Sequence, residues 1–171
     1  MILRAATDED LKTLISWIKG KEACRLWAGP VVRFPLTLRN LKKDISYSEE
    51  NTFAMKNTGG KLLGLGQLLR KENDRVHMAR IIVSPLQRGN GYGERLCRLL
   101  IDEGIKRFGK VYFTLNVYSE NSTAVKLYQK LGFKPKPAPS DSIPDEDIFY
   151  MVLNLDHTVG FCSRKNEEIS I

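Results

Sequence analysis

Apolar residues in the first part of the chain recur at the spacing of helices. Residues 2–6 (ILRAA) form a short apolar run that predicts a strand. Thr7 follows this run and Asp10 comes three positions later, so a hydroxyl and a carboxylate can satisfy the free backbone amides of a helix start. The predicted helix carries its apolar residues on one face, namely Leu11, Leu14, Ile15 and Ile18. After a segment rich in glycine and proline, Thr37 is expected to cap a second helix that runs to Ile45.

The middle of the chain changes to short apolar runs that are typical of strands. These runs cover residues 52–56, 62–69 and 76–83. The first turn between them contains two glycines, which tolerate the positive φ of tight hairpins, and the second turn is the polar run at 72–74. The pattern predicts three consecutive antiparallel strands.

The second half of the chain alternates between helical and extended patterns. A long helix is predicted over 91–108, a strand over 111–117, a helix over 122–131 and a last strand over 148–155. The loop at 134–147 is rich in proline and acidic residues and is expected to be irregular. The whole pattern predicts an α+β fold around one sheet. We expect a single domain over 1–155 and, because 156–171 show no period, a flexible C-terminal tail there.

Composition agrees with one globular core. The chain has 171 residues and is 42% hydrophobic, so one core can bury about two-thirds of the surface that is exposed on unfolding. No run approaches the roughly 18 uninterrupted apolar residues of a membrane span, and the N-terminal residues do not resemble a signal peptide. We therefore expect a soluble, cytoplasmic protein with no membrane partner.

Cysteine content and net charge narrow the kinds of site and ligand that the chain can have. Cys24, Cys97 and Cys162 are odd in number and widely spaced, which suits neither a disulfide framework nor a metal site, and Cys97 is expected to pack in the core. The net charge of +7 is typical of nucleic-acid binding, but it would equally suit a small ligand rich in phosphate. Basic residues are most frequent between Arg88 and Lys136.

The most informative stretch is 81–95, which reads IIVSPLQRGNGYGER. An apolar strand ends there, and Gly89, Gly91 and Gly93 crowd the turn that opens the next helix. Glycines let backbone N–H groups approach an anion, and the N-terminus of the helix adds about half a unit of positive charge. The turn therefore predicts a binding site for a pyrophosphate.

Two other glycine-rich phosphate sites are disfavoured by spacing. A P-loop ends in GK[ST], whereas Gly93 is followed by Glu94 and Arg95. A dinucleotide-binding fingerprint needs GxGxxG and an acidic residue at the end of the next strand, but that strand ends in Asn116 and Val117. A flexible turn without a ligand is the remaining alternative.

Two motifs together identify a family. Residues 88–93, RGNGYG, resemble the [QR]xxGx[GA] pattern of the GNAT superfamily of N-acetyltransferases, with Gln87 also in place ahead of them. Residues 121–133, NSTAVKLYQKLGF, are similar to the NxxAxxLYxxxGF signature of the same superfamily. The second motif by itself would fit an amphipathic helix that stops at Gly132. Its place one helix and one strand after the glycine turn makes the pair specific.

The resemblance implies a fold, a donor and a set of binding residues. It implies the GNAT fold, a mostly antiparallel sheet with about four flanking helices that splays in a V between its fourth and fifth strands. It also implies an acyltransferase that takes acetyl-CoA as donor and needs no metal. The residues expected to bind acetyl-CoA are Ile81, Ile82 and Val83 at the pantetheine, Arg88, Gly89, Asn90, Gly91, Tyr92, Gly93 and Glu94 at the pyrophosphate, and Asn121 at the cofactor arm.

Acetyl transfer to an amine needs a base for the amine and an acid for the departing thiolate. The resemblance makes Tyr128 the candidate acid, with a core tyrosine as the alternative. Asn116 stands where the branch that acetylates ribosomal N-termini has a glutamate, and His77 stands at the glutamate position of the histone branch. Strand alternation places His77 on one face with Ala79, Ile81 and Val83, so a packed histidine, with ordered water as the base, is the competing interpretation.

The sequence leaves the acceptor and the oligomeric state open. The acceptor is a primary amine, either a protein N-terminus, a lysine or a small molecule, and a cationic one could be attracted by acidic residues at 44–50 and 141–147. A homodimer is compatible with the sequence. Two other functions compete with the enzyme, a catalytically silent acyl-CoA-binding module and a basic nucleic-acid-binding domain. The absence of any recognisable DNA- or RNA-binding motif disfavours the latter.

Overall fold

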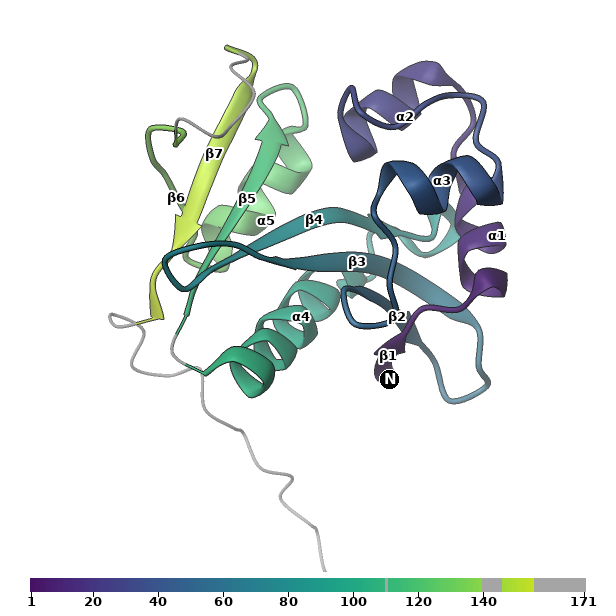
Figure 1. Cartoon of the computed structure of the whole chain (residues 1–171), viewed down its shortest axis with the longest axis horizontal. Helices are drawn as coiled ribbons and strands as arrows, with labels where there is room; N and C mark the ends of the chain where they lie inside the picture. Colours follow the sequence, from purple (N-terminus) through teal and green to yellow (C-terminus); the bar gives the residue numbers. More distant parts are fainter. Residues whose placement is uncertain (110, 140–145, 156–171) are drawn as a thin grey trace, which may run out of the picture.

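The computed structural model describes residues 1–109, 111–139 and 146–155, and these residues form one seven-stranded sheet with five α-helices (Figure 1). The strands are β1 (Ile2–Ala5), β2 (Thr52–Lys56), β3 (Leu62–Arg70), β4 (Arg75–Val83), β5 (Tyr112–Tyr118), β6 (Lys134–Pro135) and β7 (Ile148–Leu153). The helices are α1 (Asp8–Trp17), α2 (Lys21–Ala28), α3 (Leu38–Asp44), α4 (Tyr92–Phe108) and α5 (Ser122–Lys130), and a short 3₁₀ helix covers Pro85–Gln87. The predicted tail at 156–171 lies outside the described residues.

The sheet is mostly antiparallel and divides at its centre. Its strand order is β1-β2-β3-β4-β5-β7-β6, and only β4 and β5 are parallel to each other. These two strands pair only at Arg75 with Tyr112, Val76 with Phe113 and His77 with Thr114. Beyond this short ladder they diverge, and Figure 1 shows β5 and β7 on one side of the opening and α2 on the other. The predicted V between the fourth and fifth strands is confirmed.

Two apolar clusters cover the two faces of the sheet. One lies between the sheet and α4 and α5, and it contains the fully buried Cys97, as predicted. A side chain at Gly104 of α4 would approach the ring of Phe113 to 2.6 Å, so only glycine lets the helix lie this close to β5. The second cluster joins α1, α2 and α3 to β2, β3 and β4 through residues such as Leu11, Leu41 and Leu65.

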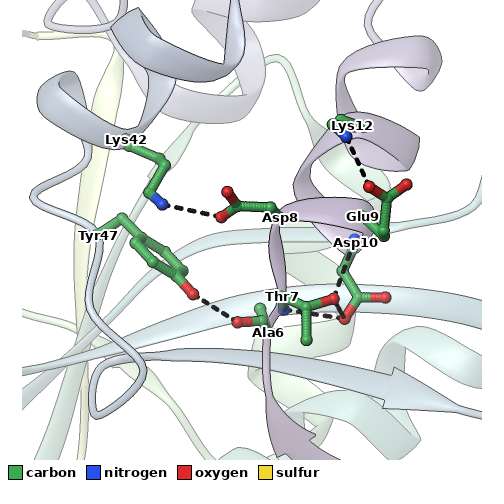
Figure 2. Close-up of polar contacts among 8 residues, drawn as sticks. All are labelled: Ala6, Thr7, Asp8, Glu9, Asp10, Lys12, Lys42 and Tyr47. Atoms are coloured by element: carbon green, nitrogen blue, oxygen red, sulfur yellow. Dashed lines mark hydrogen bonds and ion pairs between the residues drawn. The ribbon is translucent and has the colours of Figure 1, made fainter.

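The N-terminal helices are tied to the sheet by polar contacts (Figure 2). Thr7 and Asp10 form the predicted capping box, in which the Thr7 amide donates to the Asp10 carboxylate at 3.0 Å. The hydroxyl of Tyr47, just after α3, donates to the carbonyl of Ala6 at 2.6 Å. Lys42 of α3 donates to Asp8 of α1 at 2.8 Å. These contacts fix α1 and α3 relative to β1.

A β-bulge in β4 overturns the expected alternation of its side chains. Leu65 pairs with Ile82 but Gln67 pairs with Ala79, so β4 carries an extra residue, and Arg80 takes up the positive φ of 53°. Met78 before the bulge belongs to the α4 cluster, whereas Ile82 after it belongs to the opposite cluster. The prediction that His77 shares a face with Ile81 and Val83 is therefore wrong, because those two side chains pack toward α4.

Two elements were not expected from the sequence. Helix α2 begins after Gly20, which provides no side-chain cap, so the usual signal of a helix start is absent. The pair Glu22 and Arg25, at helical spacing between two glycines, was the available signal. Strand β6 lies within the loop that was expected to be irregular, and its two residues pair with Val152 and Met151 of β7.

Candidate active site

A cavity of about 390 Å³ lies at the opening between β4 and β5. Its walls come from α2 and the turn after it, from β3, β4, β5 and β7, and from the start of α5. His77, Tyr128 and Asn121 all line it, so the structure brings three of the predicted site residues together although they are far apart in the sequence. The pairing of β4 with β5 ends at His77, so the edge of β4 that faces the opening has backbone N–H and C=O groups available to an extended ligand.

Tyr128 is held rigidly at the wall of this cavity. Only 8% of its surface is exposed, and its ring packs edge-on against Phe133 at a centroid distance of 5.9 Å. Burial raises the pKa of the Tyr128 hydroxyl well above its usual value, and the nearby Cys97 raises it further. The phenol therefore stays protonated at all working pH values and can donate a proton to an anion formed beside it.

His77 lies at the closed end of the opening. Its Nδ1 is 2.9 Å from the hydroxyl oxygen of the fully buried Thr114 on β5. In the tautomer that carries the proton on Nδ1, this nitrogen donates to Thr114 and the lone pair resides on Nε2. The imidazole is thus oriented by a fixed partner, as a general base requires.

The predicted residues of β4 have different surroundings. Ile81 lines the cavity, Val83 packs partly buried against the α4 cluster, and Ile82 is buried on the opposite face. The side chain of Ile82 therefore lies away from the α4 side on which those of Ile81 and Val83 pack. Its expected contact with a donor can come only from its backbone.

The glycine turn before α4 has the form of an anion cradle. Gly89 and Gly91 have φ of 80° and 74°, and nothing lies within 4 Å of the position that a side chain at either would take. No side chain caps the first turn of α4, and among the described residues no acceptor is found for the backbone amides of 89–94. Asn90 stabilises the turn through bonds to the carbonyls of Gln87 and Arg88. These free amides fit a pyrophosphate.

Three further predicted residues, Tyr92, Gly93 and Glu94, lie at the start of α4. The carboxylate of Glu94 is already bonded to Lys130 at 2.6 Å and to Arg98 at 2.9 Å, and these bonds lower its pKa. It can offer an anion only its backbone amide. A side chain at Gly93 would meet Leu127 of α5 at 3.2 Å, so this glycine allows α4 and α5 to approach each other. Tyr92 is the first residue of α4 and packs partly buried against the α4 cluster.

Asn121 and Asn116 have distinct positions around the cavity. Asn121 caps α5 by accepting from the amide of Ala124 at 3.3 Å, and it also lines the cavity. Asn116 on β5 is exposed and lines the cavity as well, so the position of the glutamate in one branch of the resembled family is occupied by a side chain without a proton-accepting group.

The cavity also contains residues that the sequence did not single out. Trp27 and Val31 come from α2 and the turn after it, Lys71 directly follows β3, and Arg80 belongs to β4. No local pattern marks Trp27, Val31 or Arg80, because the missed helix and the bulge bring them to the site. In the described ranges no group of histidine, cysteine and carboxylate side chains could hold a metal ion, and no helix there is long and apolar enough to cross a membrane.

Comparison with known proteins gives a consistent family assignment. Residues 11–133 match the model of the acetyltransferase (GNAT) family. The chain is 30% identical over 135 residues to spermidine N(1)-acetyltransferase of Escherichia coli, a match that spans 77% of this chain and 71% of that protein. It is 28% identical over 104 residues to a UPF0039 protein of Schizosaccharomyces pombe, a match that spans 60% of this chain and 65% of that protein.

A solved structure supports the same fold. Spermidine N-acetyltransferase from Vibrio cholerae, solved with CoA and spermine, superposes with a TM-score of 0.70 and 20% sequence identity. The superposition covers 89% of this chain and 94% of that one. At this identity the similarity establishes the arrangement of helices and strands.

Proposed function

The chain belongs to the GNAT acetyltransferase family, whose members are acyltransferases that use acetyl-CoA, and on this basis we propose that it acetylates a primary amine in the cavity between β4 and β5. The observation that carries the proposal is the position of Tyr128. Tyr128 lines the cavity at the split of the sheet, where the unpaired edge of β4 can bind an extended arm, and burial keeps its hydroxyl protonated. A protonated phenol at this place can supply a proton to a leaving group that departs beside it.

The donor is assigned to the two features that fit it. The free amides of 89–94 suit its pyrophosphate, and the open edge of β4 at 81–83 suits the amide groups of its pantetheine arm. The donor carries an activated thioester, and the protein holds this thioester in position and forms hydrogen bonds to it.

The acceptor must reach the thioester as a neutral amine. We assign His77 as the base that takes the proton from the amine, directly or through a water, because its Nδ1 is oriented by Thr114 and its ring lines the cavity. The nitrogen then attacks the carbonyl carbon, the bond between carbon and nitrogen forms, and the bond between carbon and sulfur breaks. Tyr128 donates its proton to the departing sulfur.

Transfer is proposed to be direct, without an acetylated enzyme. Cys97 is a fully buried residue of α4, and burial raises the pKa of its thiol to about 12. Cys24 is buried as well, with its sulfur 3.8 Å from the carbonyl of Val32. Neither of these described cysteines lines the cavity, and a protonated, buried thiol is a poor nucleophile.

The proposal is tested by mixing the protein with acetyl-CoA and representative amines, namely amino acids, polyamines, an aminoglycoside, a lysine peptide and a peptide with a free N-terminus. Release of free thiol and the mass of the acetylated product are measured together. We expect both signals with at least one amine and equal amounts of thiol and product. Tight acetyl-CoA binding without product from any of these amines would instead favour the silent acyl-CoA-binding module.

A further inference from the structure

Arg80 is a cation in the active-site cavity that the protein leaves incompletely satisfied. The residue lines the cavity and is partly buried. One guanidinium nitrogen, Nη1, donates to Oε1 of Gln67 at 2.7 Å. The Nε atom is buried without a partner, whereas Nη2, from which no described residue accepts, is not buried. A guanidinium has five N–H donors, so most of its hydrogen-bonding capacity remains available.

The partner of Arg80 is held in one orientation. Gln67 is fully buried, and its Nε2 donates to Thr52 Oγ1 at 2.8 Å and to the Ile45 carbonyl at 3.2 Å. These contacts fix which end of the amide is the oxygen, so Oε1 must face Arg80. The guanidinium is therefore positioned by an amide and not neutralised by a carboxylate.

The position of Arg80 in the chain is also strained. It is the extra residue of the β4 bulge, its φ is 53°, and its carbonyl accepts from Trp27 Nε1 at 2.9 Å. A left-handed conformation is uncommon for a non-glycine residue, and such strain is often found at binding sites. Burial lowers the pKa of Arg80, because charge is disfavoured in a partly apolar wall. Among the residues that the structure describes, no anion pairs with Arg80 to compensate for these costs.

The cavity as a whole has cationic character. Lys71, Arg75 and Arg80 line it, and no aspartate or glutamate is found among its described lining residues. A polyamine would bring further positive charge into this cavity, whereas an anionic group would offset the charge that is already there.

We propose that the acceptor is a small amine that also carries a carboxylate, an amino acid, and that Arg80 binds this carboxylate in the cavity between β4 and β5. This inference rests on the proposed acetyl transfer and names its substrate class. A planar carboxylate matches the fork of a guanidinium, and the cavity of about 390 Å³ has room for an α-amino acid, in which the amine and the carboxylate lie close together.

The cations also assist the reaction itself. Positive groups near the acceptor lower the pKa of its ammonium, which favours the neutral amine that attacks. The reaction balances as amino acid and acetyl-CoA giving the N-acetyl amino acid and CoA thiol. The proton lost by nitrogen passes to the base, and Tyr128 supplies the proton that sulfur gains. Arg80 takes no part in these transfers and acts as the residue that positions the acceptor.

The inference is tested with acceptors that differ only in the anion. Rates of acetylation are compared for L-amino acids, for the corresponding L-amino acid amides, for spermidine and for O-phosphoethanolamine, at saturating acetyl-CoA. We expect kcat/KM for the best amino acid to exceed that of its amide by about 10- to 100-fold, as for a hydrogen-bonded ion pair. In Arg80→Gln the KM of the amino acid should rise until this ratio is lost, while the amide reacts as before. Arg80→Lys should retain part of the ratio.

Arg39→Gln is the matched control, because Arg39 is a residue of α3 that does not line the cavity. It should leave the ratio unchanged. The acetyl-CoA melting shift of each variant shows whether it is folded, and the comparison of acid with amide in the parent protein needs no variant at all.

Three results overturn the inference while the proposed acetyl transfer stands. These are equal rates for acid and amide, a preference for spermidine or O-phosphoethanolamine over every amino acid, and an unchanged ratio in folded Arg80→Gln. If no amine of any kind is acetylated, the proposed function itself fails and the inference falls with it.

Discussion

His77 and Thr114 meet across the last rung that joins β4 to β5, with 2.9 Å between His77 Nδ1 and Thr114 Oγ1. Beyond this rung the two strands diverge and the cavity opens. The contact therefore fixes an imidazole at the closed end of the active site.

Replacing His77 tests its role as the base. The parent enzyme is expected to gain activity as the pH rises from acid towards neutrality, because only the neutral imidazole can accept the proton. His77→Gln should lose this ascending limb and retain acetyl-CoA affinity. The measurement is kcat/KM against pH from 5 to 9 for the parent and for His77→Gln. If the pH profile of His77→Gln matches that of the parent, His77 is not the base, and ordered water removes the proton from the amine.

Replacing Gly91 tests the anion cradle. Acetyl-CoA at about 100 times its Kd should stabilise the parent by roughly 2.7 kcal/mol. Gly91→Asp places a negative charge in the cradle and should remove most of this gain. Asparagine is nearly identical in size to aspartate but uncharged, and it tolerates the left-handed backbone of this position. Gly91→Asn should therefore retain more of the stabilisation by acetyl-CoA than Gly91→Asp. The readout is the melting shift with acetyl-CoA, and equal shifts in the two variants would place the pyrophosphate elsewhere.

Asp10 is expected to make folding sensitive to acid. Burial tends to raise the pKa of Asp10, but the hydrogen bonds from Lys56 and Thr7 outweigh this and lower it below its usual value. Its stabilisation is thus present above the unfolded pKa of about 3.9 and is lost as the pH falls through the lower folded pKa. Asp10→Asn should reduce the free energy of unfolding by about 1–3 kcal/mol at pH 7, and the difference should vanish in acid.

Glu9→Gln is the control for this prediction. Glu9 lies on the same turn and bonds only the exposed Lys12, so its removal should change stability by less than about 1 kcal/mol (Figure 2). Denaturant unfolding of the three proteins at pH 7 and pH 3 gives the comparison. An equal loss in both variants would show that the buried capping box contributes no more than a surface pair.

Much of the fold could be predicted from the sequence because its signals are local. The capping box of Thr7 and Asp10 and the two glycines before β3 are confirmed, and the elements predicted over 91–108, 111–117 and 122–131 are found to within one residue at each end. The last strand begins at Ile148 as predicted but ends at Leu153, two residues earlier than expected. The pair of motifs also identified the GNAT family, the acyltransferase class and acetyl-CoA as donor. Helix α2 was missed because Gly20 gives no capping signal, and β6 was missed because two residues form a strand only through pairing with β7.

The part of the site that could not be predicted depends on one tertiary feature. Alternation along β4 predicts side-chain direction only while the strand is regular, and the bulge at Arg80 reverses it. The reversal places Arg80 in the cavity and separates His77 from Ile81 and Val83. Nothing in the local sequence marks this bulge, because a residue other than glycine holds the positive φ.

Replacing Tyr128 tests the central claim most directly. Burial keeps the pKa of its hydroxyl above the usual range, so the phenol is expected to act as an acid without a descending limb of its own up to about pH 10. Tyr128→Phe retains the ring and its packing on Phe133 and removes only the proton donor. Tyr112→Phe is the control, because Tyr112 lies on β5 outside the cavity.

The measurement is kcat for both variants together with the acetyl-CoA melting shift on the same preparations. Loss of a general acid typically lowers the rate by 10²- to 10⁴-fold, and water entering the thiolate site can restore part of it, so we predict a fall in kcat of about 10- to 100-fold for Tyr128→Phe. The melting shift of Tyr128→Phe and the kcat of Tyr112→Phe should stay at the parent values. An undiminished kcat in a folded, acetyl-CoA-binding Tyr128→Phe protein would contradict the account.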